Sequence, residues 1–267
     1  MPELPEVETI ARGLNRLLSG CGIEDLTVSW PRTVHSASLP LGDLVGDRIE
    51  AVSRAGKLIV LELRSGRRLA VHLRMTGRLL VTDAGTQVPY SKVVVSLGSG
   101  RALVFADARK FGRVRLFVGD VKQTLGIGID PFDASLDDVA LKALFAGKRT
   151  PVKALLLDQR RIAGVGNIYA AEALFYAGVR PRRQAKSLSR RERIELLRAL
   201  RAVLRRAIRH RGSSVDDYVD AEGKRGGFQK HLAVYGRTGS PCPNCRALVR
   251  RIVVAQRSTF YCPACQQ

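Results

Sequence analysis

The stretch LIVLELRSGRRLAVHL, residues 58–73, carries the pattern that decides the fold of the first half of the chain. Its two aliphatic runs, 58–63 and 68–73, are rich in residues that favour strands. The turn RSGR between them contains a glycine and is short enough to join neighbouring antiparallel strands. The stretch therefore predicts a β-hairpin.

A second pair of runs repeats this pattern further along the chain. KVVVSL (92–97) and RALVFA (101–106) flank the turn GSGR. Strands that follow one another with glycine-containing turns pair as hairpins and stack to bury their apolar faces. Residues from about 23 to 118 therefore predict an antiparallel β-sandwich or barrel.

Helical periodicity marks the segments before and after this β region. From Pro5 to about Leu18, apolar side chains recur at helical spacing, and Gly20 follows as a stop. The stretch GIGIDPFDASL (126–136) has the composition of a linker. Four helices are predicted after it, over residues 137–147, 151–159 (with Pro151 at its first position), 167–178 and 189–212.

The predicted helix over 189–212 is the longest, and Ser189 with Glu192 forms a capping box at its start. The simplest interpretation of the arginines on one side is a solvated face. Residues 213–230, which follow, are polar and Gly-rich and predict a long mobile loop. The apolar face of the helix is predicted to consist of Ile194, Leu197, Leu200, Leu204 and Ile208.

The charge balance is far from that of an average globular protein. Lys and Arg total 45 against 24 acidic residues, a formal net charge of +21. Such an excess predicts a polyanionic partner, with nucleic acid favoured over an anionic membrane because the basic residues are spread along the whole chain. No apolar run reaches transmembrane length and the acidic start is unlike a signal peptide, so we expect a cytoplasmic protein.

Four of the five cysteines form two CxxC motifs, CPNC (242–245) and CPAC (262–265), separated by residues 246–261. Two such motifs at this spacing favour a tetrahedral Zn²⁺ site, whereas a redox pair needs only one. Four protein ligands leave no position for substrate, so the zinc is predicted to be structural. The sequence between the motifs predicts a basic β-hairpin, and Cys21 is interpreted as an ordinary buried thiol.

Pro2 raises a separate question, because removal of Met1 would make its nitrogen a free secondary amine. An α-amine titrates at about 7.7–8.0, so part of it is neutral and nucleophilic near pH 7. A secondary amine that attacks a sugar aldehyde carbon gives an iminium, which draws electrons for elimination. Glu3 stands beside it as a proton carrier. From these residues alone, a proline that merely opens the helix remains the competing interpretation.

Six motifs together resemble the bacterial formamidopyrimidine-DNA glycosylase family, in the family's order and over almost the full length. The resemblance implies a multidomain α+β fold with an N-terminal helix and antiparallel β-sandwich, a helix–two-turn–helix module and a C-terminal zinc finger. The implied domains are 1–130 (catalytic sandwich), 131–230 (helical, with a lesion-capping loop) and 231–267 (zinc finger). The motifs are MPELPEVET at the start, AGK (55–57), HLRMTG (72–77), DARKFG (107–112), GVGNIYAAEALF (164–175) and QRSTFYCPACQ (256–266).

The resemblance implies a repair enzyme that excises 8-oxoguanine and formamidopyrimidines and then cuts the strand by β,δ-elimination. It places Pro2 as the Schiff-base nucleophile, Glu3 as the acid that assists sugar ring opening and Glu6 as a second carboxylate near the amine. Lys57 matches the proton donor for β-elimination. Arg257 matches the residue for phosphate binding and δ-elimination, which suits a planar guanidinium. This chemistry requires that the active protein begins at Pro2, with Met1 removed.

The resemblance also places Met75, Arg109 and Phe111 as the residues that fill the space left by an everted nucleotide. In isolation, Met75 and Phe111 would be interpreted as core residues. Apolar wedges offset the cost of flipping a base, and Arg offers donors to the orphaned cytosine. Further DNA-contacting positions implied by the resemblance are His72, Lys92 (where many members carry His), Arg149, Lys153, Asn167 and Tyr235.

Two alternatives stay open beside this interpretation. One is an endonuclease VIII-like enzyme, which shares the Pro-Glu start and prefers oxidised pyrimidines. The other is a catalytically dead zinc protein that binds damaged DNA, against which Pro2, Glu3, Lys57 and Arg257 all argue. The expected partner is damaged double-stranded DNA and not a membrane. The resemblance implies a monomer in the bacterial cytoplasm, associated with the nucleoid through DNA.

Overall fold

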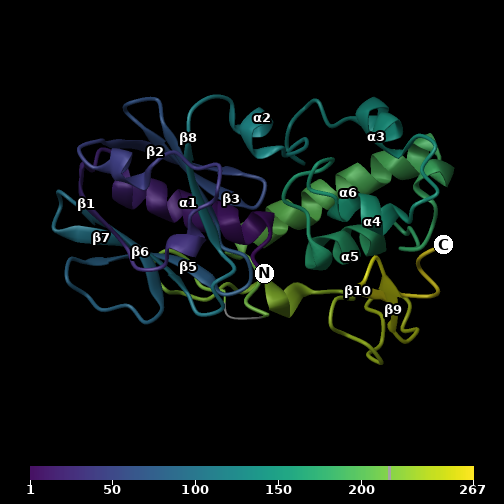
Figure 1. The fold of residues 1–267 in the computed structure, drawn as a ribbon. Coiled ribbons are helices and arrows are strands. Elements are labelled where there is room, and N and C mark those ends of the chain that lie inside the picture. The colour runs from purple at the N-terminus through teal and green to yellow at the C-terminus, as the bar shows by residue number, and fades with distance from the viewer. Residues whose placement is uncertain (216–217) are drawn as a thin grey trace. The chain divides into compact units, whose positions relative to one another are not determined.

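The computed structural model describes residues 1–215 and 218–267 (Figure 1). The chain forms two compact units. The β unit comprises Met1–Leu125 and His210–Gly227, and the helical unit comprises Gly126–Arg209 and Phe228–Gln267. Within the described residues, no helix combines the length and the apolar character needed to cross a membrane.

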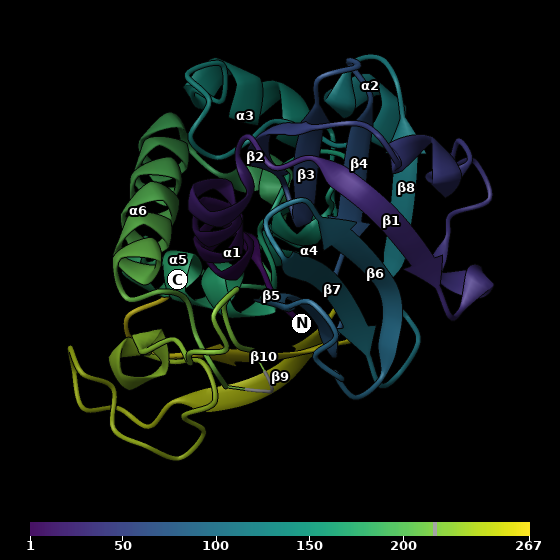
Figure 2. The same ribbon diagram turned by 90° about the vertical axis from the view of Figure 1, so that its left-hand side faces the viewer.

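The β unit is a sandwich of two four-stranded antiparallel sheets, which confirms the predicted fold class (Figure 2). One sheet has the order β1-β6-β7-β5 and the other the order β2-β3-β4-β8. The strands are β1 (Ile23–Val28), β2 (Ile49–Ala55), β3 (Leu58–Leu63), β4 (Arg68–His72), β5 (Gly77–Asp83), β6 (Ser91–Leu97), β7 (Arg101–Asp107) and β8 (Arg113–Phe117).

Both predicted hairpins are present. β3 pairs with β4 across RSGR in a register that sets Leu58 opposite His72, and β6 pairs with β7 across GSGR. β3 does not alternate between apolar and polar residues because both of its faces are covered. Ile59 and Leu61 face the main core, whereas Val60 joins a second cluster with Ala70 and Phe117. Residues of the short helix α2 (Val121–Leu125), which the sequence did not predict, cover this cluster.

Helix α1 (Leu4–Leu18) packs against β2 and β3 and adds its apolar face to the core of the sandwich. Its first turn holds the carboxylate of Glu6. One Glu6 oxygen accepts the Glu3 N–H (2.8 Å) and the other accepts the N–H of Ser213 (2.7 Å). The segment 210–227 is thereby attached to the start of the chain, although more than 200 residues separate the two in sequence.

The 213–230 segment was predicted to be a long mobile loop, of which residues 216–217 lie outside the described residues. The described part contains no strand, but it is more packed than such a loop would be. Tyr218 and Ala221 join the core of the β unit. Burial raises the pKa of Tyr218, and the nearby Glu6 carboxylate adds to the rise. The phenol is therefore neutral in the physiological range.

The helical unit contains α3 (Asp138–Phe145), α4 (Val152–Leu157), α5 (Asn167–Tyr176) and α6 (Arg190–Arg209). Two details differ from the sequence prediction. Pro151 is the residue before α4, because its ψ of 137° is extended. Ile194 is exposed, whereas Leu197, Leu200 and Leu204 are buried. The capping box at α6 is confirmed, since Ser189 N–H donates to Glu192 (2.8 Å) and Glu192 N–H to the Ser189 hydroxyl (3.3 Å).

The C-terminal hairpin of β9 (Arg250–Val254) and β10 (Arg257–Tyr261) belongs to the helical unit. It contributes to a small core that includes Ala171 and Phe175 of α5. The division into three domains at residues 130 and 230 stays a prediction. The remaining regular elements are single 3₁₀ turns: η1 (Pro31–Thr33), η2 (Leu41–Leu44), η3 (Ala185–Ser187) and η4 (Phe228–His231).

The contact between Glu6 and the 210–227 segment can be tested at Gly212. Its φ is +76°, and an added Cβ would lie 2.7 Å from Glu6 Oε1. We expect Gly212→Ala to lower the free energy of unfolding by about 2–4 kcal/mol, through left-handed strain and this collision. Gly223→Ala is the matched control, because φ is +81° there and the added carbon meets nothing within 4 Å. Equal losses in urea unfolding of both variants would contradict the proposed packing against Glu6.

Candidate nucleic-acid active site

Pro2, Glu3 and Glu6 lie together, all buried, at the N-terminus of α1. Glu3 is the residue before the helix, and Glu6 closes its first turn by accepting the Glu3 N–H. Two carboxylates at this end also interact favourably with the helix dipole. Because both Glu6 oxygens accept backbone N–H groups, Glu6 holds the chain in place. Glu3 is the carboxylate nearest in sequence to the Pro2 nitrogen.

Lys57 and His72 lie at the same end of the hairpin that β3 forms with β4. Lys57 follows Gly56, whose φ of +60° makes the bend between β2 and β3. The Lys57 side chain is buried. Burial, with the charges of Arg74 and Lys57, lowers the pKa of His72 to about 3. Its Nδ1 accepts the Arg74 N–H (3.1 Å), so a neutral His72 carries its proton on Nε2 and can donate it there.

Met75, Arg109 and Phe111 form one exposed cluster, although they come from two turns. The Arg109 guanidinium lies 5.0 Å from the centre of the Phe111 ring and 3.4 Å from Met75 Sδ. Met75 is 46% and Phe111 49% exposed, so neither is a core residue. Two large apolar side chains that are exposed and in contact with a guanidinium can stack against bases. Lys92, by contrast, is buried in β6.

In the helical unit, Lys153 and Asn167 lie side by side. Lys153 is fully buried, and its Nζ donates to Asn167 Oδ1 (2.6 Å), Thr259 Oγ1 (2.7 Å) and the Ser258 carbonyl (3.3 Å). Asn167, the first residue of α5, donates to the same Ser258 carbonyl (3.0 Å). The two side chains therefore bind α4, α5 and β10 together. A direct phosphate contact by either stays a prediction.

The other predicted residues of the helical unit lie in different surroundings. Arg149 is exposed in the turn before α4. Tyr235 packs edge-on against Phe260, with the ring centres 5.0 Å apart. Arg257 is exposed and begins β10 directly after Ala255 and Gln256, which both have positive φ (49° and 57°). Positive φ at both positions is typical of a tight two-residue hairpin turn, so Arg257 stands at the tip of the hairpin.

Glu172 is a buried carboxylate whose role the sequence did not reveal. It lies in α5 and accepts the N–H groups of Ala233 (2.8 Å), Val234 (3.0 Å) and Tyr235 (2.9 Å). Burial raises its pKa, and the three N–H donors oppose that rise. A lone Glu within the apolar helix NIYAAEALFYAG was the available signal, but its partners lie about 60 residues further along.

The four cysteines of the CxxC motifs converge as predicted, with all Sγ atoms within 4.8 Å of one another. Sγ separations are 3.9 Å for Cys242 and Cys265 and 3.4 Å for Cys245 and Cys262. Four ligands at tetrahedral Zn–S distances would lie about 3.8 Å apart. Hydrogen bonding to the Cys245 sulfur raises the pKa of Cys265, followed by burial, and a bound Zn²⁺ would reverse this by favouring thiolates. The donor set therefore fits zinc.

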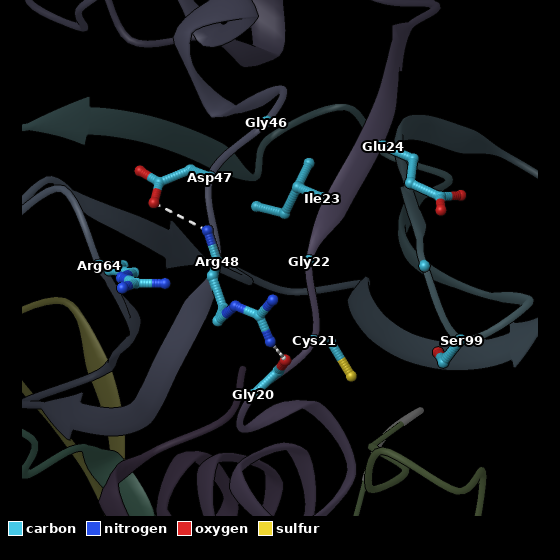
Figure 3. A pocket seen from close by; sticks show the side chains of 11 residues that line it. Gly20, Cys21, Gly22, Ile23, Glu24, Gly46, Asp47, Arg48, Arg64 and Ser99 are labelled. Atoms are coloured by element: carbon cyan, nitrogen blue, oxygen red, sulfur yellow. Dashed lines mark hydrogen bonds between the residues drawn. The ribbon is translucent and has the colours of Figure 1, made fainter.

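The hollow of about 530 Å³ in Figure 3 lies elsewhere in the β unit. It is next to the C-terminal end of α1, where the Arg48 guanidinium donates to the Gly20 carbonyl (2.6 Å). A helix of 15 residues is about 22 Å long, and Pro2 precedes its other end. None of the predicted site residues lines this hollow.

Family profiles match most of the chain. They are the formamidopyrimidine-DNA glycosylase N-terminal domain (residues 1–114), the formamidopyrimidine-DNA glycosylase H2TH domain (127–219) and the zinc finger found in FPG and IleRS (239–267). The last match, with the four converging sulfurs, confirms the predicted site for one structural zinc ion.

Individual proteins match over the full length. A formamidopyrimidine-DNA glycosylase from Chloroflexus aggregans is 45% identical, with 100% of this chain and 98% of that protein covered. The crystal structure of the MutM (Fpg) protein from Thermus thermophilus is 40% identical, with a TM-score of 0.89 and 99% and 98% coverage. A Lactococcus lactis Fpg mutant in complex with Fapy-dG-containing DNA is 32% identical, with a TM-score of 0.90 and both chains fully covered.

The zinc site yields a prediction that the single tryptophan makes easy to check. Trp30 lies in the β unit, whereas the zinc ligands lie in the helical unit. A two-stranded hairpin has little core of its own, and structural zinc contributes about 10–16 kcal/mol to such modules. We expect chelation to make the 239–267 region protease-sensitive and to abolish DNA binding, while Trp30 emission stays unchanged. Retention of DNA binding by the zinc-free protein would contradict a structural role for the metal.

Proposed function

Because the chain belongs to the formamidopyrimidine-DNA glycosylase family, a family of DNA repair glycosylases, we propose that it excises oxidised purines from duplex DNA and then cleaves the strand as an AP lyase. The observation that carries the proposal is the buried group at the start of α1. There Pro2 and Glu3 are adjacent, and Glu6 anchors the turn that presents them.

The nucleophile in this proposal is the Pro2 nitrogen, which becomes an amine when Met1 is removed. It attacks C1′ of the damaged nucleotide, and the glycosidic bond breaks with its electron pair leaving on the base. Glu3 protonates the sugar ring oxygen as the ring opens, which leaves an iminium between Pro2 and C1′. The iminium acidifies the C2′ proton, so loss of that proton expels the 3′ phosphate. A second elimination expels the 5′ phosphate.

The other site residues take supporting roles in the same proposal. Lys57 supplies a proton during β-elimination, and Arg257 binds phosphate and promotes δ-elimination through its two-pronged guanidinium. Met75, Arg109 and Phe111 fill the space that the everted nucleotide leaves. The residues assigned to the DNA backbone and its surroundings are His72, Lys92, Arg149, Lys153, Asn167 and Tyr235.

Oxidised purines are favoured as substrates for two reasons. The exposed cluster of Met75, Arg109 and Phe111 matches the family's purine enzymes, and the Lactococcus lactis relative is crystallised with Fapy-dG-containing DNA. That relative is also crystallised with an oxidised pyrimidine, which keeps the endonuclease VIII-like preference as the second candidate. We further propose that the 213–230 segment caps the lesion, and that the protein acts as a monomer on chromosomal DNA in the cytoplasm.

The proposed function is tested on two duplexes that contain either 8-oxoguanine opposite cytosine or thymine glycol opposite adenine. We expect faster excision of the purine lesion, and a gap that carries phosphate at both ends. Arg257→Ala should stop most product after β-elimination, since the group proposed for the second step is gone. Arg250→Ala removes another exposed arginine from the same hairpin and should leave the products unchanged.

Two results would overturn this proposal. Faster excision of thymine glycol would favour the pyrimidine enzyme. Tight binding of either damaged duplex without any excision would favour the protein that only recognises damage.

A further inference from the structure

One buried carboxylate lies beneath the exposed cluster of Met75, Arg109 and Phe111 and binds both of the turns that supply it. Asp107 ends β7 and is 1% exposed. Its Oδ1 accepts the Thr76 hydroxyl (2.5 Å) and the Arg109 N–H (3.2 Å). Its Oδ2 accepts the Gly112 N–H (2.7 Å). A single side chain therefore connects the turn that carries Met75 to the turn that carries Arg109 and Phe111.

The backbone around Asp107 leaves little freedom for either turn. An added Cβ on Gly77 would lie 2.3 Å from the Leu73 carbonyl oxygen, so the first turn closes tightly on itself. In the second turn, Lys110 has a φ of +61°, which costs energy for a residue with a side chain. The Gly112 carbonyl accepts the Thr33 hydroxyl (3.0 Å), so Gly112 is held on both sides of its backbone.

The side chains of Met75, Arg109 and Phe111 are in contact with one another at the surface. The two apolar side chains are about half exposed, and the Arg109 guanidinium contacts both. Lys110, between Arg109 and Phe111, points elsewhere, with its Nζ 4.2 Å from the centre of the Trp30 ring. Holding apolar groups in their bound arrangement reduces the entropy that must be lost on binding.

Resting on the proposed function, we propose that Asp107 is a positioning residue for nucleotide eversion. Its carboxylate holds Met75, Arg109 and Phe111 as a preformed wedge, so that they enter the helix as one unit. Asp107 touches none of the reacting atoms in this role. It speeds the step in which the damaged base leaves the stack, and it leaves the chemistry at Pro2 unaffected.

The variant Asp107→Asn tests this with almost no change in shape. An amide offers one oxygen acceptor where the carboxylate offers two. The amide nitrogen therefore faces either the Gly112 N–H, or the Thr76 hydroxyl and the Arg109 N–H, and in the second case the Arg109 N–H keeps only its 3.3 Å contact to the Thr76 hydroxyl oxygen. The matched control is Asp47→Asn. Asp47, in another turn of the β unit, likewise accepts one hydroxyl, that of Ser65, and two backbone N–H groups.

Single-turnover excision is measured on two duplexes with 8-oxoguanine. In one duplex the lesion is paired with cytosine. In the other it lies opposite a tetrahydrofuran abasic-site analogue, so that eversion breaks no base pair. We expect Asp107→Asn to slow excision from the paired duplex on the order of 10- to 100-fold, because a buried donor is left unpaired. Excision from the duplex with tetrahydrofuran should slow less than about 3-fold, since no base pair has to be broken there. Asp47→Asn should slow neither.

Equal slowing on both duplexes, or none on either, would overturn the assignment of Asp107. If Asp107→Asn does not fold, Thr76→Val removes the hydroxyl that donates to Asp107 and accepts the Arg109 N–H, and it should show a smaller loss confined to the paired duplex. Thr76→Ser should then restore the rate, and failure to restore it would also overturn the assignment. A wild-type protein that excises neither 8-oxoguanine nor thymine glycol would contradict the proposed function itself. Failure of the proposed function is thereby distinguished from failure of the assignment of Asp107.

Discussion

The start of the chain is the constraint on which the candidate site depends, because a terminal residue is held by the chain on one side only and normally frays. Here the Glu6 carboxylate closes the first turn of α1 onto the Glu3 N–H and binds the Ser213 N–H from the far end of the sequence. The helix is itself fixed by the core of the sandwich. A terminal nitrogen can therefore be as well positioned as a side chain on a rigid element.

Buried carboxylates that accept backbone N–H groups recur in both units. Glu6 holds the first turn of α1, Asp107 holds the two turns beneath the exposed cluster, and Glu172 holds three successive residues up to Tyr235. In a chain with a net charge of +21, these three buried acids fix the positions of the turns and loops whose backbone N–H groups they accept. Most of the basic residues remain at the surface, where a polyanion can bind them.

Local patterns predicted much of the fold, and partners distant in sequence account for what was missed. The hairpin over 58–73 follows from composition and a short turn, and the zinc site follows from spacing alone. Helix α2 was missed because five residues are too few to show a helical pattern, and its Val121 and Leu125 pack against a cluster whose members lie elsewhere in the chain. The burial of Asp107 and Lys153 was not predicted, since it depends, with their bonds to Thr76 and Thr259, on the assembled fold.

The central claim is that the Pro2 nitrogen is the nucleophile, and borohydride trapping followed by peptide mapping tests it most directly. Borohydride reduces the iminium to a stable amine, so protein incubated with an 8-oxoguanine duplex should become covalently joined to DNA. We expect the joined peptide to begin at Pro2, without Met1, and Pro2→Gly to bind the duplex but to lose most trapping. A cross-link that maps to Lys57, or undiminished trapping in Pro2→Gly, would contradict that claim.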